Sequence, residues 1–462
     1  MTAALAALLC SCALTAPGSR MASVSSMAPD SWNATRQASA GIDNAWIDRF
    51  GDPQLSALVD QAMAGNLDLK VAAERVRRAQ ASARLAGADA LPQLDASLTG
   101  TRQSQRYSFL ANNAFQYNTF GASLNVNWEL DVWGRVRAGQ RAAVADLQAR
   151  EFDLKAARTS LAAQLAKAWF ALGEANDQIQ LADEAVRIRT IVLDAFQERF
   201  DRAINEDGGL GTQIRLAQSD LESSKATLAT WQGERERALR QIELLLGSYP
   251  AGKNITRKGL PAPPPAPPAG LPSELLMRRP DVLAAERRFA ANAERTTEAR
   301  RARFPSISLT GSNGTSTESL SKVLDSSFGV WSVGSGIAQP ILQGGRLMEQ
   351  ENIARSDQRI ALTELQQTVL KAFGEVEQAL VAETYLAKRI TALTKSAERA
   401  EAASLASAQD FADGNVDALT LLTAQDRRIQ SALQLANLKR IRLDNRVDLH
   451  LALGGDFKVR SR

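Results

Sequence analysis

The sequence contains an internal duplication, and this duplication limits the possible folds more than any other feature. Three short segments recur in the second half at a spacing of about 210 residues: Leu91–Leu94 and Phe304–Ile307, Gly134–Arg135 and Gly345–Arg346, and Leu246–Gly247 and Leu453–Gly454. We therefore expect two repeats, over residues 65–260 and 273–462, that supply the same elements in the same order. The segment between them, placed at 261–272, begins Pro261-Ala-Pro-Pro-Pro-Ala-Pro-Pro268 and is too rich in proline for a helix or a central strand.

Strict alternation of apolar and polar residues marks the first pair of expected strands. From Phe120 to Val132 every even position is apolar, whereas the odd positions from Thr119 to Asp131 carry no large apolar residue. Weaker copies begin at Leu94 and Ile307, and the fourth segment is the least regular. We expect strands at about 94–107, 117–132, 305–317 and 328–341, with the length and period of outer-membrane barrel strands. A soluble sandwich with one wet face is the alternative.

Long helices are expected after each pair of strands. No proline occurs from Arg135 to Asp201, and apolar residues recur there in steps of three, four and seven. The second repeat shows the same seam, so we place helices at about 135–203, 210–247, 345–412 and 416–453. At 1.5 Å per residue, the longest would measure roughly 100 Å. The charged runs on their other faces are interpreted as solvated surface.

Four strands per chain are too few to seal a sheet in a membrane. An open edge in hydrocarbon leaves backbone N–H and C=O groups unpaired at several kcal/mol each. Two chains would give eight strands and a filled interior, whereas three chains give twelve strands and room for an aqueous channel. The expected fold is therefore mainly α with a membrane β-barrel: a homotrimer with a twelve-stranded barrel, continued by a tube of long helices through the periplasm.

The first residues are typical of an export signal with a lipid anchor. Residues 3–16 form an apolar run too short to span a bilayer. Leu9-Cys10-Ser11-Cys12 resembles a bacterial lipoprotein cleavage box, which predicts a signal peptide over 1–11 and acylation at Cys12. An ordinary signal peptide with incidental cysteines is the alternative.

Composition excludes several classes of protein. The net charge of +4 is too close to neutral for a protein built around nucleic acid. A single histidine, His450, nearly excludes a His-ligated metal site, and we expect His450 to be surface or packing. Ser-His-Asp chemistry lacks any supporting motif, so we expect neither enzymatic activity nor a cofactor. After the leader no apolar run reaches 18 residues, so any membrane insertion would use strands.

Several longer motifs resemble one known family. They are Trp46–Pro53, Trp128–Arg135, Leu276–Asp281, Phe304–Leu309, Pro340–Arg346 and Ala452–Gly455. In this order, and duplicated, they resemble the TolC-like outer membrane efflux proteins, in the NodT or OprM-like lipoprotein branch. The resemblance implies a lipid-anchored trimer in the outer membrane that extends into the periplasm, with residues 12–64 as anchor and equatorial segment. It also implies passive efflux with a periplasmic adaptor protein and an inner-membrane transporter of the resistance-nodulation-division (RND) type.

The resemblance also places candidate site residues at the two helix turns. The turns are expected at Asp207–Leu210 and Asp413–Val416, with glycines that suit tight turns. The candidates for adaptor docking are Gly208, Gly209, Leu210, Gly414, Asn415 and Val416. The gate is expected at Leu419 and Thr423, with negative charge from Asp413 and Asp417 nearby. Thr423 stands where relatives often carry an aspartate. Packing in the helical superhelix is the alternative role for Leu419.

Two other functions stay open at this point. A channel for type I protein secretion would share the whole architecture. A structural coiled-coil envelope protein would explain the helices but not the paired alternating segments.

Overall fold

The structure is a computed structural model that describes residues 28–34, 45–106, 114–202, 210–253, 257 and 259–457. Cys12, Gly208 and Gly209 lie outside these residues.

The fold is mostly helical with one four-stranded antiparallel sheet, which confirms the expected mainly α chain with four strands. The order α3, β1, β2, α4, α5 recurs as α7, β3, β4, α8, α9. The bounds are α2 Pro53–Gly65, α3 Leu67–Ala88, β1 Gln93–Arg106, β2 Ala114–Glu129, α4 Arg135–Arg202, α5 Leu210–Leu245, α6 Pro272–Arg278, α7 Pro280–Arg301, β3 Ser306–Thr317, β4 Gly329–Ala338, α8 Arg346–Ala412 and α9 Ala418–Ala452, with 3₁₀ turns η1 Asp48–Phe50, η3 Leu320–Lys322 and η4 Ser326–Phe328.

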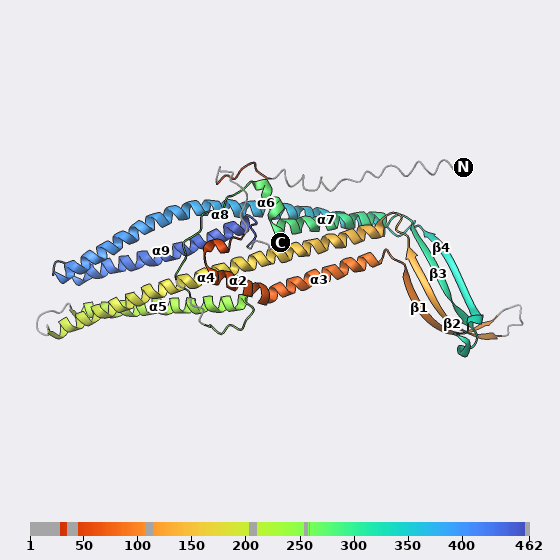
Figure 1. Cartoon of the computed structure of the whole chain (residues 1–462), viewed down its shortest axis with the longest axis horizontal. Coiled ribbons are helices and arrows are strands. Elements are labelled where there is room, and N and C mark those ends of the chain that lie inside the picture. Colours follow the sequence, from red (N-terminus) through yellow and green to blue (C-terminus); the bar gives the residue numbers. More distant parts are fainter. Residues whose placement is uncertain are drawn as a thin grey trace. The chain divides into compact units, whose positions relative to one another are not determined.

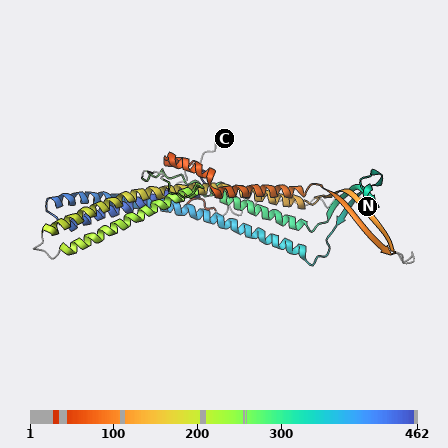
Figure 2. The same cartoon turned by 90° about the horizontal axis from the view of Figure 1, so that it is seen from below.

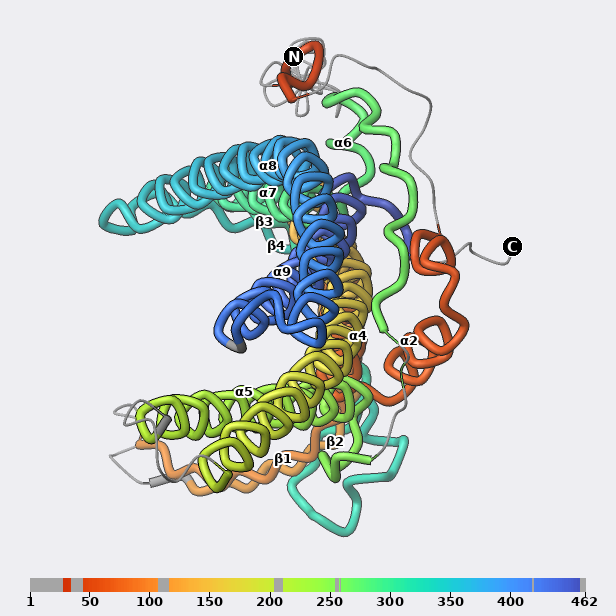
Figure 3. Tube along the Cα trace, turned by 90° about the vertical axis from the view of Figure 1, so that its left-hand side faces the viewer, coloured from red at the N-terminus to blue at the C-terminus, as the bar shows by residue number. Residues whose placement is uncertain are grey.

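Two helices dominate the structure. α4 has 68 residues and α8 has 67, which corresponds to roughly 100 Å each. α5 lies beside the second half of α4, and α9 lies beside the second half of α8 (Figures 1 and 2). Figure 3 shows the same two hairpins end-on. Within the described part of the chain, none of the helices combines the length and apolar character needed to cross a membrane.

The sheet joins the two halves of the chain in the order β1-β2-β3-β4 (Figure 1). Its register aligns apolar residues on one face, because Leu94 pairs with Val126, Val126 with Gly311, and Gly311 with Val333. The other face is polar. There Ser97 and Ser123 lie 2.9 Å apart (Oγ to Oγ), and Ser312 and Ser332 lie 2.8 Å apart. One apolar and one polar face thus run across all four strands.

Two strand ends differ from the sequence expectation. β2 ends at Glu129 rather than near 132, because Asp131 forms the turn that starts α4: its carboxylate accepts the N–H groups of Val136 and Arg137 at 3.0 and 2.9 Å. These N–H bonds outweigh the opposing effect of burial and lower the pKa of Asp131. β4 ends at Ala338, two residues before Pro340, which has no N–H to donate to a ladder.

The chain divides into two compact units that cut across both repeats. One contains residues 1–71, 154–282 and 368–462, and the other contains 72–153 and 283–367, including the sheet. The first unit holds the main apolar core. Its central side chains, all at 0% exposure, include Trp46, Leu55, Leu165, Trp169 and Ile242.

Asp52 fixes the position of α2 within this core. Its carboxylate caps α2 by accepting the N–H groups of Gln54 and Leu55, both at 3.1 Å. The same carboxylate accepts the indole N–H of Trp169 at 2.7 Å and pairs with Arg257 at 3.3 Å. Arg257 also lies 4.7 Å above the Trp169 ring. One side chain therefore joins α2, α4 and the segment after α5.

Candidate functional site

The turn between α8 and α9 is a closed helix cap. Gly414 has φ +77°, a left-handed conformation that glycine adopts without a Cβ penalty. Its N–H donates to the Phe411 carbonyl at 3.1 Å, and the N–H of Asn415 donates to the Asp410 carbonyl at 2.8 Å. These two bonds form a Schellman motif. The turn containing Gly414, Asn415 and Val416 is therefore a defined surface rather than a loose loop.

The two acidic residues of this turn both have local partners. Asp417 caps α9 by accepting the N–H of Thr420 at 2.8 Å. Its hydrogen bonds to Thr420 lower the pKa of the Asp417 carboxyl. Asp413 accepts the side-chain N–H of Gln409 at 3.2 and 3.1 Å. Both carboxylates remain exposed, so they hold the turn and also leave negative charge at the surface.

Leu419 and Thr423 line a groove beside this turn. The groove has a volume of about 750 Å³ and lies between α8 and α9, with Ala403 and Ser407 on its α8 side. Leu419 is 69% exposed although it is apolar. The Thr423 hydroxyl donates to the Leu419 carbonyl at 2.8 Å. The structure thus brings together Leu419 and Thr423, and it places Asp417 two residues before Leu419 as the cap of the same helix.

The other expected turn is described only at its edge. α5 begins at Leu210, whereas Gly208 and Gly209 precede the described residues. Their proposed docking role, and that of Leu210, remains a prediction.

Two arginines near these turns join helices that are distant in sequence. Arg428 of α9 lies 2.7 Å from Glu184 of α4 and 3.4 Å from Glu401 of α8. Arg189 of α4 pairs with Asp426 of α9, and its Nη1 lies 3.6 Å from Asp220 of α5. Charged runs that the sequence pattern predicts to be solvated faces thus contain these links. Partners so far apart in sequence leave no local signal.

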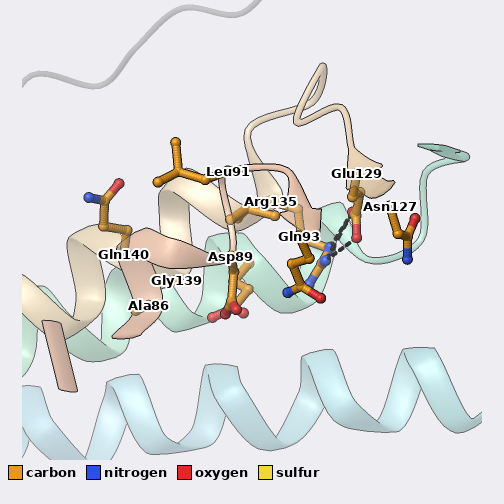
Figure 4. A pocket seen from close by; sticks show the side chains of 11 residues that line it. Ala86, Asp89, Leu91, Gln93, Asn127, Glu129, Arg135, Gly139 and Gln140 are labelled. Atoms are coloured by element: carbon orange, nitrogen blue, oxygen red, sulfur yellow. Dashed lines mark hydrogen bonds and ion pairs between the residues drawn. The ribbon is translucent and has the colours of Figure 1, made fainter. Parts of the chain in front are cut away.

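A polar pocket lies where strands meet helices. This junction pocket has a volume of about 370 Å³ and is lined on the strand side by Gln93, Asn127 and Glu129. Figure 4 shows Arg135 reaching Glu129, and their atoms lie 2.8 and 2.9 Å apart. Gln93 and Asn127 are partners in the β1–β2 register and belong to the polar face of the sheet. The junction pocket therefore opens on that polar face.

Carboxylates dominate the junction pocket. Asp89, Glu129 and Glu298 line it against a single cation, Arg135. Burial raises the pKa of Glu298, with a further contribution from Asp89, and outweighs the opposing effect of Arg135 and Arg295. Gly139 leaves room for this carboxylate, because a Cβ at this position would lie 2.9 Å from Glu298 Oε1 and the Glu298 side chain would have to shift.

His450 packs in the core. It is fully buried and stacks on Trp46, with ring centroids 5.7 Å apart. Burial, aided by Arg446 and Arg49, lowers the His450 pKa to about 3, so the imidazole is neutral at physiological pH. Among the described residues, no group of three or more His, Cys, Asp or Glu side chains could hold a metal ion.

Comparison with known families decides the class of protein. The model of the family described as outer membrane efflux protein matches residues 58–248 and 271–455, one stretch in each half of the chain. The chain belongs to the outer membrane efflux protein family. The function is therefore efflux through an outer membrane channel, and the location is the outer membrane.

Curated relatives extend over nearly the whole of this efflux protein. It is 32% identical to outer membrane protein OprJ of Pseudomonas aeruginosa over 440 residues, which covers 93% of this chain and 90% of OprJ. It is 29% identical to the cation efflux system protein CusC of Escherichia coli K12, covering 92% of each chain. Neither the family description nor these names indicates a catalytic activity.

Solved structures show the same fold. The outer-membrane channel OprN superposes with a TM-score of 0.86 at 28% identity, covering 93% of this chain and 97% of that one. The open state of the Neisseria gonorrhoeae MtrE outer membrane channel superposes with a TM-score of 0.81 at 28% identity, covering 93% of this chain and 97% of that one. The efflux protein therefore shares the architecture of outer membrane channels, and a structural coiled-coil role is not supported.

Proposed function

We propose that three copies of this chain close a twelve-stranded barrel and form a passive exit duct from the periplasm. The observation that carries this proposal is the sheet, which has an apolar face and two outer strands, β1 and β4, that each pair on one side only within the described residues. In hydrocarbon the free edges would cost several kcal/mol per unpaired backbone group. Pairing β4 of one copy with β1 of the next removes every edge.

The dimensions of such a barrel suit a duct. Strands about 4.8 Å apart and tilted by about 40° give twelve strands a circumference of about 75 Å and a diameter of about 24 Å. Eight strands, from two copies, would enclose an interior that side chains fill. The polar face, with its serine pairs and the junction pocket, would then line the water-filled interior.

Exposed apolar side chains on two helices support the same assembly. Leu67, Val71 and Leu85 of α3 are 62%, 50% and 70% exposed, and Ile353 and Ile360 of α8 are similarly exposed. α3 leads into β1 and α8 follows β4, so these two helices flank the two edges of the sheet in the chain. In the closed barrel, α8 of one copy would therefore lie next to α3 of the next.

The assembly is tested by fractionation and imaging of the full-length protein. We expect it to sediment with the outer membrane. Detergent-solubilised particles should show threefold symmetry and a long hollow stem by electron microscopy. Lone protomers that stay monodisperse in lipid would contradict the proposal.

We place the gate at Leu419 and Thr423, beside the α8–α9 turn. An exposed leucine next to two exposed carboxylates, Asp413 and Asp417, fits a constriction that seals when the copies meet and that still attracts cations. Replacing Leu419 and Thr423 together by alanine should increase the closed-state conductance in planar bilayers severalfold. Unchanged closed-state conductance would refute this gate.

A matched control isolates the gate from general loss of leucine. Leu405 of α8 is 65% exposed and lies on the side of α8 away from the groove residues Ala403 and Ser407. Leu405→Ala removes the same side chain and should leave the conductance unchanged. An equal leak in the control would show that the double variant acts by loosening the helices.

Partners and cargo complete the proposal. Tripartite assembly predicts a periplasmic adaptor at the two helix turns and an inner-membrane RND transporter that supplies the energy, while this chain performs no chemical step. Acylation at Cys12 would anchor the protein to the outer membrane. The names of three relatives, at 27–29% identity, refer to cations (CusC), pyoverdine (OpmQ) and solvents (SrpC). Membership of the family therefore does not identify the substrate.

A further inference from the structure

We propose that an arginine-lined groove on the polar side of the helices binds oxyanionic solutes, those carrying carboxylate or phosphate groups, on their way through the duct. The passage of solutes rests on the proposed function, whereas the groove itself is a feature of the structure. The groove, which we call the arginine groove, lies within the unit that contains the sheet.

Four helices build the arginine groove. It has a volume of about 600 Å³ and draws Arg75 and Arg78 from α3, Arg150 from α4, and Arg288 and Arg295 from α7, while Glu364 comes from α8. Asp146 is the second carboxylate of the lining. The lining thus holds five guanidinium groups and two carboxylates, and Asp146 pairs with Arg295. A volume of this size is within the range of small-molecule sites.

Two of these arginines are uncommitted. Within the described residues, the side chains of Arg75 and Arg78 form neither an ion pair nor a hydrogen bond. Arg288 and Arg150 share one carboxylate, that of Asp153, at 2.5 and 3.2 Å. Each guanidinium carries five N–H donors in a planar fork that matches the oxygens of carboxylate and phosphate. Many donors therefore remain for a ligand.

The phase of the helices shows which way the groove faces. On α3, Arg75, Arg78 and Ser82 are followed at helical spacing by Ala86 and Asp89, and the last two line the junction pocket. α4 shows the same relation, since Ala143 and Asp146 continue the face of Val136 and Gly139. The junction pocket opens on the polar face of the sheet. The arginine groove therefore opens on the side that lines the interior of the proposed barrel.

Charge changes sign along this face. Carboxylates line the junction pocket next to the strands, whereas arginines line the groove further along the helices. An oxyanion attracted by the arginines would meet repulsion at the carboxylates before it enters the barrel. The arginines would raise the local concentration of anions, and repulsion by the carboxylates would keep each solute from staying bound.

Binding is tested on the purified, detergent-solubilised protein by isothermal titration with tripolyphosphate and, in a separate arm, citrate. The variant Arg75→Gln/Arg78→Gln removes the two uncommitted cations without breaking an ion pair. We expect its affinity for tripolyphosphate to fall at least tenfold. Citrate binding of similar strength would assign carboxylates as well as phosphates to the site, and binding of only one probe would restrict the class.

Arg77→Gln is the matched control. Arg77 lies on the same helix but pairs with Glu74, is 74% exposed and does not line the groove. It should bind tripolyphosphate like the wild type. Equal affinity in the double variant and the wild type, or an equal loss in Arg77→Gln, would overturn the proposed site.

A conductance measurement separates this inference from the proposed function. In planar bilayers under a KCl gradient, the double variant should shift the reversal potential towards cations relative to Arg77→Gln. Conductance with no shift would overturn the role in transit. A protein that does not conduct but binds tripolyphosphate through Arg75 and Arg78 would contradict the duct and leave the binding site standing.

Discussion

The helical core and the four-stranded sheet treat their apolar side chains in opposite ways. In the helical core Leu165 and Trp169 of α4 and Ile242 of α5 are completely buried within the chain. In the sheet every residue of β4 is exposed, and Val333 has 79% of its surface accessible. The helical core buries its apolar side chains within the chain, whereas the sheet leaves its apolar side chains exposed.

This contrast predicts that different kinds of substitution destabilise the two regions. The helical core should follow the ordinary rules of cavity formation in water. The sheet should be sensitive to charge on one face only, since in the proposed barrel lipid would cover that face and water would cover the other.

The largest effect is expected for an arginine placed on the apolar face of the sheet. Val333 lies in the middle of β4, in the row formed with Gly311, Val126 and Leu94. Near the bilayer midplane an arginine costs about 2 to 4 kcal/mol. Since each trimer would carry three copies, Val333→Arg should lower the stability of the assembly by about 6 to 12 kcal/mol. Recovery of trimer from the outer membrane measures the effect.

The neighbouring residue provides the control for this prediction. Ser332 points to the polar face, where its hydroxyl meets Ser312. Ser332→Arg should assemble far better than Val333→Arg, because its charge would remain in water. Equal losses would mean that the sheet has no lipid-facing side, and the comparison would fail.

A cavity in the helical core should have the next largest effect. Trp169 is fully buried, and its indole N–H donates to Asp52. Trp169→Ala should lower the free energy of unfolding by about 3 to 5 kcal/mol through the cavity and the lost contacts. Urea unfolding followed by circular dichroism measures this. Assembly of the strands should suffer less than in Val333→Arg.

An exposed aromatic residue on another long helix is the control. Tyr385 of α8 is 61% exposed, so Tyr385→Ala leaves no cavity. Its unfolding free energy should lie within about 0.5 kcal/mol of the wild type. A similar loss in both variants would show that the helical core is not the main source of stability.

The same contrast explains what the sequence could and could not reveal. Alternation over residues 118–132 predicted β2, because a period of two is a local signal. The strand ends were harder, since the hydrogen bonds of Asp131 and not the pattern decide where β2 stops. A proline-free seam predicted α4 in the same local way.

The site residues depend more on tertiary structure. Gly414 was predictable as a turn residue because its conformation is a local requirement. The pairing of Arg428 with Glu184 was not, since 244 residues separate them. The arginine groove was missed for the same reason: five arginines on three helices acquire a common face only after the helices have packed.

A buried carboxylate gives the smallest and most specific prediction. Asp444 of α9 lies in the helical unit, where its Oδ2 accepts from Arg440 and its Oδ1 is buried without a partner in the described structure. Burial raises the pKa of Asp444 to about 6, although Arg440 and Lys167 act in the opposite direction. The pKa in the unfolded chain is near 3.9. The folded protein therefore binds a proton more tightly than the unfolded protein does.

The sign of the pH dependence follows from these two values. Because the folded state holds the proton longer, the contribution of Asp444 to stability is lost as the pH rises from about 4 to about 6. Two pKa units correspond to about 3 kcal/mol at most. Asp444→Asn cannot ionise, so the difference in unfolding free energy between wild type and variant should decrease by up to that amount across this range.

Asp448→Asn, one turn further along α9, removes the half-exposed carboxylate that pairs with Lys167 but retains Asp444. Asp448 contributes to the raised pKa of Asp444, but less than burial does. Denaturant unfolding at several pH values should therefore show most of the wild-type decrease in Asp448→Asn and its loss in Asp444→Asn. If both variants kept the decrease, the helical core would tolerate a charge as readily as the polar face of the sheet does, and burial would not be what distinguishes the two regions.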